Sequence, residues 1–212
     1  MFPSISSQSC VLADSFAHRD IGVRGADHRL RVIGGRLSGR RFRAPGGEVR
    51  PTSDRVREAL FGRLGSLEGA RVLDLYAGSG ALGIEAISRG AVEATFVERE
   101  ARTLVVLRAN LEALGIDPIA SVAPGDVPAV VRRLGRAKER FDLVLVDPPY
   151  ASEEPTRAFE ALVGAAVLSP GAMLVLERDK RDPSPQVEGL AAVDERRYGD
   201  TVVARFIAGQ AE

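Results

Sequence analysis

The residues best suited to chemistry are 147–150, where an apolar run ends in Asp-Pro-Pro-Tyr. Pro148 and Pro149 lack backbone N–H donors and hold φ at about −65°, so the chain leaves the run rigidly. The Asp147 carboxylate and the backbone carbonyls can then accept hydrogen bonds, and Tyr150 adds an aromatic ring. This combination suits a planar ligand with an NH2 group, such as a nucleobase. The alternative interpretation is a rigid strand-to-helix turn.

A glycine-rich loop at residues 74–83 is a second candidate site. Gly78, Gly80 and Gly83 fit the pattern G-x-G-x-x-G, which lets a ligand approach the backbone closely. Two cofactor classes compete: a dinucleotide, whose pyrophosphate would sit at the helix N-terminus, and S-adenosylmethionine, which has no phosphate. Asp74 favours the second class, because its carboxylate would repel a pyrophosphate but could hold a charged amino-acid group.

Two more carboxylates follow the next predicted strands. Glu98 is placed to accept hydrogen bonds from both hydroxyls of a ribose, and Asp126 after Gly125 could bind an adenine amino group. The structural alternatives are a solvated strand end for Glu98 and a helix cap for Asp126. The candidate cofactor-binding residues are Asp74, Tyr76, Ala77, Gly78, Gly80, Glu98, Gly125, Asp126 and Asp147.

These residues need a framework that brings strand ends together. The pattern predicts strands at 71–76, 94–98, 121–123, 143–146 and 172–176, separated by helices that include 159–167 and one ending at Gly115. Strands alternating with helices indicate a parallel, doubly wound α/β sheet. Residues 191–197 and 202–207 predict an antiparallel hairpin at one edge. Another helix, with Val56, Leu60 and Leu64 at four-residue spacing, precedes the sheet.

Arginines are concentrated in residues 19–57, where eleven of them stand against four acidic residues, giving 11 − 4 = +7. The net charge of the whole chain is +0, so the remainder is acidic. Residues 30–43 alternate partly around glycines, which predicts a hairpin with its arginines outward. This basic arm favours a nucleic-acid contact over a merely solvated surface. The candidate RNA-binding residues are Arg31, Arg36, Arg40, Arg41 and Arg43.

Composition limits the class of protein. With 212 residues, 45% of them hydrophobic, the chain fits one domain plus an appendage. The single Cys10 and two histidines provide neither a disulfide framework nor a clustered zinc site, so we expect no metal and a reducing compartment. No apolar stretch approaches the roughly 20 residues of a membrane span. We therefore expect a soluble, cytoplasmic monomer that is not exported.

The motifs resemble a known superfamily when they are taken in order. Asp74-x-x-x-Gly78-x-Gly80, then Glu98, Asp126 and residues 147–150, resemble the class I S-adenosylmethionine-dependent methyltransferases that act on exocyclic amino groups. Within it, the sequences at 31–35, 39–41 and 50–61 are similar to the bacterial 16S ribosomal RNA guanine-N2 methyltransferase family. This resemblance covers about residues 30 to 207. Residues 1–27 have no counterpart in it, and Gly62 stands where the family often has a polar residue.

The resemblance implies both an architecture and a partner. It implies a doubly wound, seven-stranded, Rossmann-like class I methyltransferase sheet, with a C-terminal antiparallel hairpin and a small N-terminal β-hairpin that engages 16S rRNA in the small subunit or an assembly intermediate. The segment containing Thr52 would close over the cofactor. We expect a loosely attached or disordered extension at 1–27, a basic RNA-contacting hairpin at 28–50, a linking helix over the cofactor pocket at 51–69 and the methyltransferase domain at 70–212.

We expect methyl transfer from S-adenosylmethionine to the exocyclic N2 of a guanine, with Asp147, Pro148, Pro149 and Tyr150 as the catalytic set. Hydrogen bonds from the N2 protons to Asp147 and the Pro148 carbonyl would make that nitrogen more nucleophilic, while Tyr150 stacks on the base. RNA loops offer such unstacked bases at low cost.

Three other functions compete with this one. A DNA adenine-N6 or cytosine-N4 methyltransferase shares the Asp-Pro-Pro-Tyr chemistry, but the chain has no room for a separate target-recognition domain. A dehydrogenase would leave residues 147–150 unexplained and lacks a hydride-transfer acid. A non-catalytic RNA-binding assembly factor is disfavoured by the intact motif set.

Overall fold

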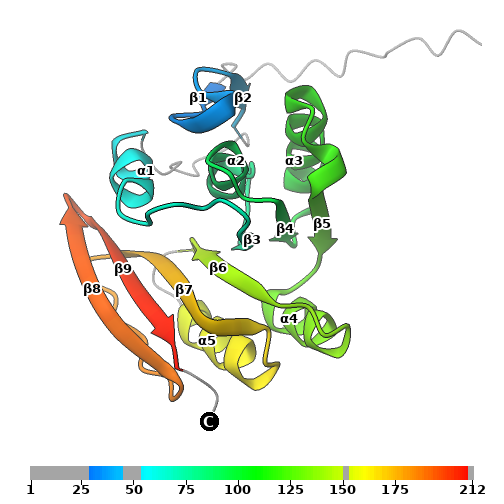
Figure 1. Ribbon diagram of the computed structural model, residues 1–212. Helices are drawn as coiled ribbons and strands as arrows, with labels where there is room; N and C mark the ends of the chain where they lie inside the picture. Colours follow the sequence, from blue (N-terminus) through cyan, green and yellow to red (C-terminus); the bar gives the residue numbers. More distant parts are fainter. Residues whose placement is uncertain (1–28, 45–53, 150–152, 210–212) are drawn as a thin grey trace, which may run out of the picture.

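The computed structural model describes residues 29–44, 54–149 and 153–209, and it centres on a seven-stranded sheet (Figure 1). The strand order is β5-β4-β3-β6-β7-β9-β8. Strands β3 to β7 are parallel, whereas β9 pairs antiparallel with both β7 and β8. The bounds are β3 Arg71–Leu75, β4 Glu93–Glu98, β5 Ala120–Pro124, β6 Phe141–Val146, β7 Leu168–Asp179, β8 Leu190–Tyr198 and β9 Thr201–Ala208. The predicted doubly wound sheet and its C-terminal hairpin are confirmed.

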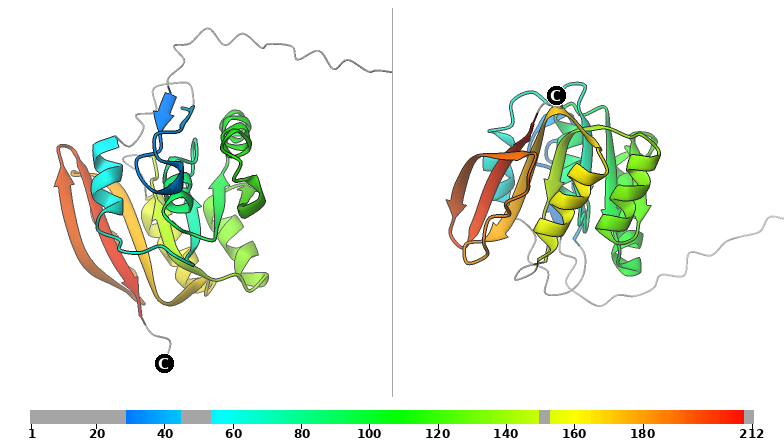
Figure 2. Two further views of the ribbon diagram at one scale, coloured as in Figure 1. Left: turned by 45° about the horizontal axis from the view of Figure 1, so that its top comes forward. Right: turned by 90° about the horizontal axis from the view of Figure 1, so that it is seen from below.

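Helices cover both faces of this sheet. The first face carries α1 (Asp54–Phe61), α2 (Ala81–Ser88) and α3 (Ala101–Leu114), and the second carries α4 (Val127–Arg136) and α5 (Glu154–Gly164) (Figure 2). Along β3, Val72 packs in the core of the first face, while Leu73 and Leu75 pack in the core of the second. Because alternate side chains enter opposite cores, the side chains on both faces of a central strand must be apolar. The central strands therefore have nearly continuous apolar sequences.

The N-terminal hairpin is a separate two-stranded sheet that lies beside α2 and α3 (Figure 1). β1 (Arg29–Arg31) and β2 (Arg41–Arg43) pair antiparallel, and the short 3-10 helix η1 (Gly35–Leu37) lies between them. Leu30 and Phe42 face the first core, whereas the arginines at the strand ends are exposed. The predicted hairpin with outward arginines is confirmed.

Buried polar contacts fix this hairpin to the body. The fully buried carboxylate of Glu85 on α2 accepts the backbone N–H groups of Ile33 at 2.7 Å and Gly34 at 2.8 Å. Asn110 on α3 accepts the Arg43 N–H at 2.8 Å and donates to the Arg43 carbonyl at 2.9 Å. Losing either side chain would leave partly buried backbone groups without these partners, so the two contacts fix the hairpin to α2 and α3.

Several predicted boundaries were wrong. Leu64 lies beyond α1, which ends at Phe61, and α5 ends at Gly164, three residues before the predicted end. β3 stops at Leu75, because Tyr76 adopts a left-handed conformation with φ of 59°. Residues 1–27 lie outside the described residues. In the part of the chain that the structure describes, no helix has the length and apolarity needed to cross a membrane.

Candidate active site

The predicted site residues meet at the carboxyl edge of the sheet. β3 and β6 are neighbours with Leu75 opposite Val146, so Asp74 and Asp147 stand at the ends of adjacent parallel strands. From these two strands the sheet extends in opposite directions, through β4 and β5 on one side and β7 on the other. Open α/β sheets bind their ligands at such a switch point.

Four carboxylates lie along this edge of the sheet. They are Glu98 at the end of β4, Asp74 on β3, Asp147 after β6 and Glu177 on β7. The residue before each of them packs in the core of the second face, which by strand alternation directs the carboxylates to the first face. Glu177 was not among the predicted site residues, although a charged residue that ends the apolar run 172–176 is a usable signal. It is only 4% exposed.

Asp74 is the most buried of these acids. It is 1% exposed, and its carboxylate accepts the backbone N–H of Gly83 at 2.9 Å. Burial raises the pKa of Asp74 well above its ordinary value, and the nearby charges of Asp147 and Glu98 raise it further, against the opposing effect of the Gly83 N–H. A cationic group bound at this edge would stabilise the ionised form of Asp74. The arrangement suits the ammonium of an amino-acid moiety better than any phosphate.

The three glycines of the loop have different roles. A Cβ on Gly80 would come within 2.6 Å of Leu107, and one on Gly83 within 2.3 Å of Phe96, so these two positions are closed by packing. At Gly78, with φ of 56°, the nearest atom to such a Cβ is a loop carbonyl 3.9 Å away. Gly78 is therefore the glycine past which a ligand can approach the backbone.

Glu98 orders the backbone around the loop. Its carboxylate accepts N–H groups from Gly78 at 3.0 Å and from Arg99 and Glu100, both at 2.8 Å. A carboxylate offers about four lone-pair sites, so these three bonds leave little free capacity for ribose hydroxyls. The solvated strand end proposed as the alternative is wrong, because Glu98 is half-buried and its carboxylate accepts three backbone N–H groups.

Asp126 occupies the N-cap position of α4 without capping it. Its side chain makes no cap hydrogen bond, and the residue is exposed. The purely capping role considered for Asp126 is therefore wrong, and its carboxylate faces solvent. Gly125, with φ of 138°, donates its N–H to the Glu98 carbonyl at 2.9 Å, which places Asp126 directly beside the end of β4.

The Asp-Pro-Pro segment leaves β6 at the centre of this edge. Asp147 is half-buried, Pro148 is buried and Pro149 is exposed. Tyr150 and Thr52 lie outside the described residues. On the other side of this segment, Glu154 in the first turn of α5 accepts a hydrogen bond at 2.9 Å from the hydroxyl of Tyr76. No pattern in the sequence predicts this contact, because the two residues are 78 positions apart.

The hairpin arginines have different environments. Arg40 donates to the Leu114 and Ala113 carbonyls at the C-terminus of α3, both at 2.8 Å, and Arg31 pairs with Asp54 at 3.3 Å. Arg36, Arg41 and Arg43 are exposed, and within the described residues none of their guanidinium groups has a hydrogen bond or ion pair. Of the five predicted RNA-binding residues, Arg40 has the clearest structural role.

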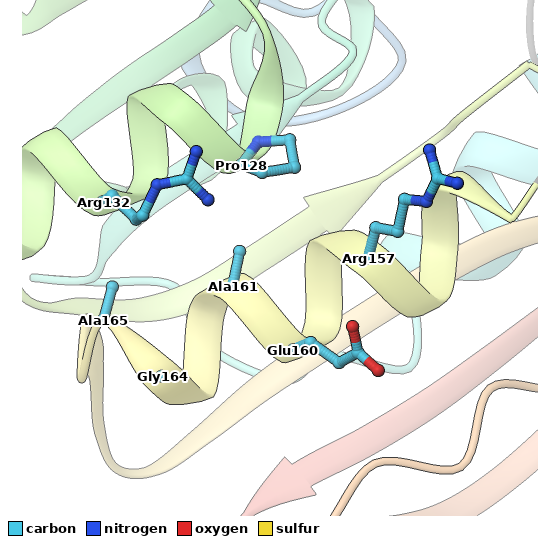
Figure 3. Close-up of a pocket in the computed structure, with 7 residues that line it drawn as sticks. All are labelled: Pro128, Arg132, Arg157, Glu160, Ala161, Gly164 and Ala165. Carbon is cyan, nitrogen blue, oxygen red and sulfur yellow. The ribbon is translucent and has the colours of Figure 1, made fainter.

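A shallow cleft of about 470 Å³ lies between α4 and α5, on the face of the sheet opposite the four carboxylates (Figure 3). Figure 3 shows Arg132 of α4 and Arg157 of α5 beside a floor of small residues that includes Ala161 and Gly164. None of the predicted site residues lines this cleft. It is separate from the candidate active site.

The sheet order, with its last strand inserted antiparallel between two others, is that of the class I S-adenosylmethionine-dependent methyltransferases. The structure of Escherichia coli yhhF matches with a TM-score of 0.78 and 31% identity, over 87% of this chain and 100% of that one. SMU.776, solved as a complex with SAH, is 18% identical with a TM-score of 0.59 over 73% of this chain and 49% of its own, a likeness of fold alone.

Sequence comparison identifies the family. Ribosomal RNA small subunit methyltransferase D of Escherichia coli K12 is 31% identical over 186 residues, 87% of this chain and 92% of that protein. YlbH of Bacillus subtilis is 35% identical over 181 residues, 84% of this chain and 98% of its own. The model of the family described as "Conserved hypothetical protein 95" matches residues 30–207, and the chain belongs to this family.

Proposed function

We propose that this protein transfers a methyl group from S-adenosylmethionine to the exocyclic N2 of a guanine in 16S rRNA. The observation that carries the proposal is the adjacency of Asp74 and Asp147 at the switch point between β3 and β6. One carboxylate suits the charged amino-acid end of the cofactor and the other suits a base amino group. Relatives named as rRNA methyltransferases of the small subunit support the substrate class.

The residues at this edge fit the cofactor. Asp74 provides a buried anion for an ammonium group, Gly78 leaves the backbone open, and Asp126 presents an exposed carboxylate for an adenine amino group. Bound S-adenosylmethionine supplies a methyl group already activated on a sulfonium. Glu98 would hold the conformation of the loop, and its remaining lone pair would accept a hydrogen bond from a ribose hydroxyl.

The protein's main contribution would be to position and polarise the base. Asp147 and the Pro148 carbonyl accept the two N2 protons, which localises the lone pair on N2 and aims it at the methyl carbon. The new N–C bond forms as the C–S bond breaks with its electron pair remaining on sulfur, and the extra N2 proton then leaves to water. Tyr150 would stack on the base, and the hairpin arginines would hold the phosphates of a structured RNA.

The test is methyl transfer from radiolabelled S-adenosylmethionine to small ribosomal subunits, free 16S RNA and duplex DNA, with the labelled nucleoside identified by chromatography. We expect the label in N2-methylguanosine from one of the RNA substrates. Label in N6-methyladenine or N4-methylcytosine of DNA would show a DNA methyltransferase instead. RNA binding without label in any substrate would support an assembly factor.

A further inference from the structure

Tyr76 combines two unusual features at the start of the cofactor loop. Its φ of 59° is in the left-handed region, which is unfavourable for an aromatic residue, so the surroundings must hold it there. The next residue, Ala77, donates its backbone N–H to the Val97 carbonyl of β4 at 2.9 Å. The reversal at Tyr76 therefore turns the chain toward β4, while the Tyr76 ring packs against the core of the second face.

The Tyr76 hydroxyl reaches the base-binding side of the site. It lies 2.9 Å from the Glu154 carboxylate oxygen and 3.3 Å from the Glu154 carbonyl. Glu154 belongs to the first turn of α5, the helix that follows the Asp-Pro-Pro-Tyr segment. At the other end of that segment, Val146 pairs in register with Leu75. The start of the base-binding segment, residues 147–149, and the start of α5 are thus held by two consecutive residues of the cofactor loop, Leu75 and Tyr76.

The surroundings favour a strong hydrogen bond. Tyr76 is half-buried, and burial together with the Glu154 charge raises the pKa of Tyr76, so the hydroxyl remains a donor. A hydrogen bond from a neutral donor to a carboxylate is stronger than one between two neutral groups. Partial desolvation strengthens it further. The charge of Asp126 also raises the pKa of Tyr76, and the charge of Arg99 lowers it.

We propose that Tyr76 is a positioning residue that couples the cofactor loop to the base-binding segment through its hydrogen bond with Glu154. This inference rests on the proposed function. When the cofactor binds against Gly78, it fixes the backbone two residues from Tyr76, and the hydrogen bond fixes the start of α5 in turn. Asp147 and the Pro148 carbonyl are then held where they meet the base amino group.

Two conservative variants test this coupling. Tyr76→Phe removes the hydroxyl and keeps the ring, and Glu154→Gln keeps the shape of the acceptor but removes its charge. We expect each to lower kcat about tenfold, with KM for the RNA and the Kd for S-adenosylhomocysteine changed less than about twofold. The double variant should be no slower than either single one, because both remove the same interaction. Glu153→Gln is the control, since Glu153 is exposed and pairs with Arg157.

A second readout does not depend on methyl transfer. Amide hydrogen exchange in the first two turns of α5 should slow when S-adenosylhomocysteine binds to the wild type and the Glu153→Gln control, and this protection should be absent in Tyr76→Phe. Equal protection in wild type and Tyr76→Phe would overturn the coupling, as would a lower melting temperature with unchanged kcat. If the wild type methylates no RNA but shows the protection, the proposed function fails and the coupling stands.

Discussion

The two halves of the candidate site are held in place by different means. Side chains from the core fix the cofactor half: Asp74 bonds to the Gly83 N–H, Glu98 to the Gly78 N–H, and Asn110 to the Ser79 carbonyl. In the base half, the stiffness comes from the two successive prolines, and Glu154 is bonded back to Tyr76. A change in one half should therefore leave a different signature from a change in the other.

This difference agrees with the ligand that we propose for each half. A small cofactor is enclosed by loop backbone, and backbone is shaped most accurately by fixed hydrogen bonds to buried acceptors. A base from a large RNA must enter and leave, so its acceptors stand on a short stiff segment at the surface, where Pro149 is exposed. In this proposal the cofactor half is preformed, and the base half is positioned from the cofactor side through the hydrogen bond between Tyr76 and Glu154.

The largest effect should come from the base half. Asp147→Ala removes the carboxylate that we propose as the acceptor of an N2 proton, so we expect kcat to fall by at least about 100-fold. The Kd for S-adenosylhomocysteine and the melting temperature should stay close to the wild-type values, because the cofactor loop keeps all its hydrogen bonds. Titration calorimetry and thermal melts measure both quantities.

The matched control is Asp117→Ala, which removes an exposed carboxylate from the 3-10 helix η2 (Asp117–Ile119), just before the start of β5 at the opposite edge of the sheet. Near-normal methyl transfer by Asp147→Ala would rule out the assigned role of this carboxylate. A large loss of activity in the control would instead mean that any change of surface charge disturbs the assay.

An intermediate effect should come from the cofactor half. Asp74→Asn keeps an acceptor for the Gly83 N–H but removes the charge, so it should weaken S-adenosylhomocysteine binding about tenfold. At a pH above the raised pKa of Asp74, the free protein should at the same time melt at a higher temperature, since the buried charge and its repulsion by Asp147 and Glu98 are gone. Opposite changes in affinity and stability would identify Asp74 as a binding group.

The raised pKa of Asp74 also predicts a pH dependence. The folded state holds this proton more tightly than the unfolded chain, so the free protein should lose stability as pH rises from the ordinary carboxyl value of about 3.9 to the raised value. A bound ammonium favours the ionised form, so cofactor affinity should rise over the same interval. Calorimetry in buffers of different ionisation enthalpy should detect proton release on binding, and this release should disappear in Asp74→Asn.

The fold could be predicted well from the sequence because its signals are local. The apolar runs at 141–146 and 71–75 must fill two cores, and helix α3 stops at Gly115, whose φ of 66° suits glycine. The wrong boundaries have physical reasons. Tyr76 continues the apolar pattern of β3, but tertiary contacts with β4 and Glu154 hold it in a left-handed turn that no local pattern reveals.

The candidate site was predictable only where chemistry and strand ends coincide. Asp74 and Asp147 interrupt or end apolar runs, so both could be placed at the edge of a parallel sheet. Glu177 belongs to the same edge, but it lies in a longer strand whose charged end resembles an ordinary exit to solvent. Glu154 is one of several acids near the start of a helix, and only the fold shows which of them meets Tyr76. The roles of Glu177 and Glu154 depend on contacts between residues that are far apart in the sequence.

The smallest effect should come from the hairpin, where the sequence suggested one role for five arginines. Arg36 and Arg41 are exposed, and their guanidinium groups make no hydrogen bond or ion pair in the described part of the chain, so replacing both with alanine should leave the melting temperature unchanged. RNA affinity should fall, and the slope of log K against log salt should flatten by about 0.7 to 0.9 for each phosphate that the variant no longer neutralises. Fluorescence anisotropy with labelled 16S RNA fragments at several salt concentrations measures this slope.

Arg40→Ala is the matched comparison within the same hairpin. This variant removes one positive charge, whereas the double variant removes two. It also breaks two hydrogen bonds to the last carbonyls of α3, so the free energy of unfolding should fall by about 1 kcal/mol. Its salt slope should change less than that of the double variant, because its guanidinium is already engaged by the protein. If Arg40→Ala flattened the slope as much per charge as the Arg36 and Arg41 pair, the guanidinium would have to leave α3 and bind phosphate in the complex. An unchanged slope in the double variant would leave the whole hairpin with a structural role.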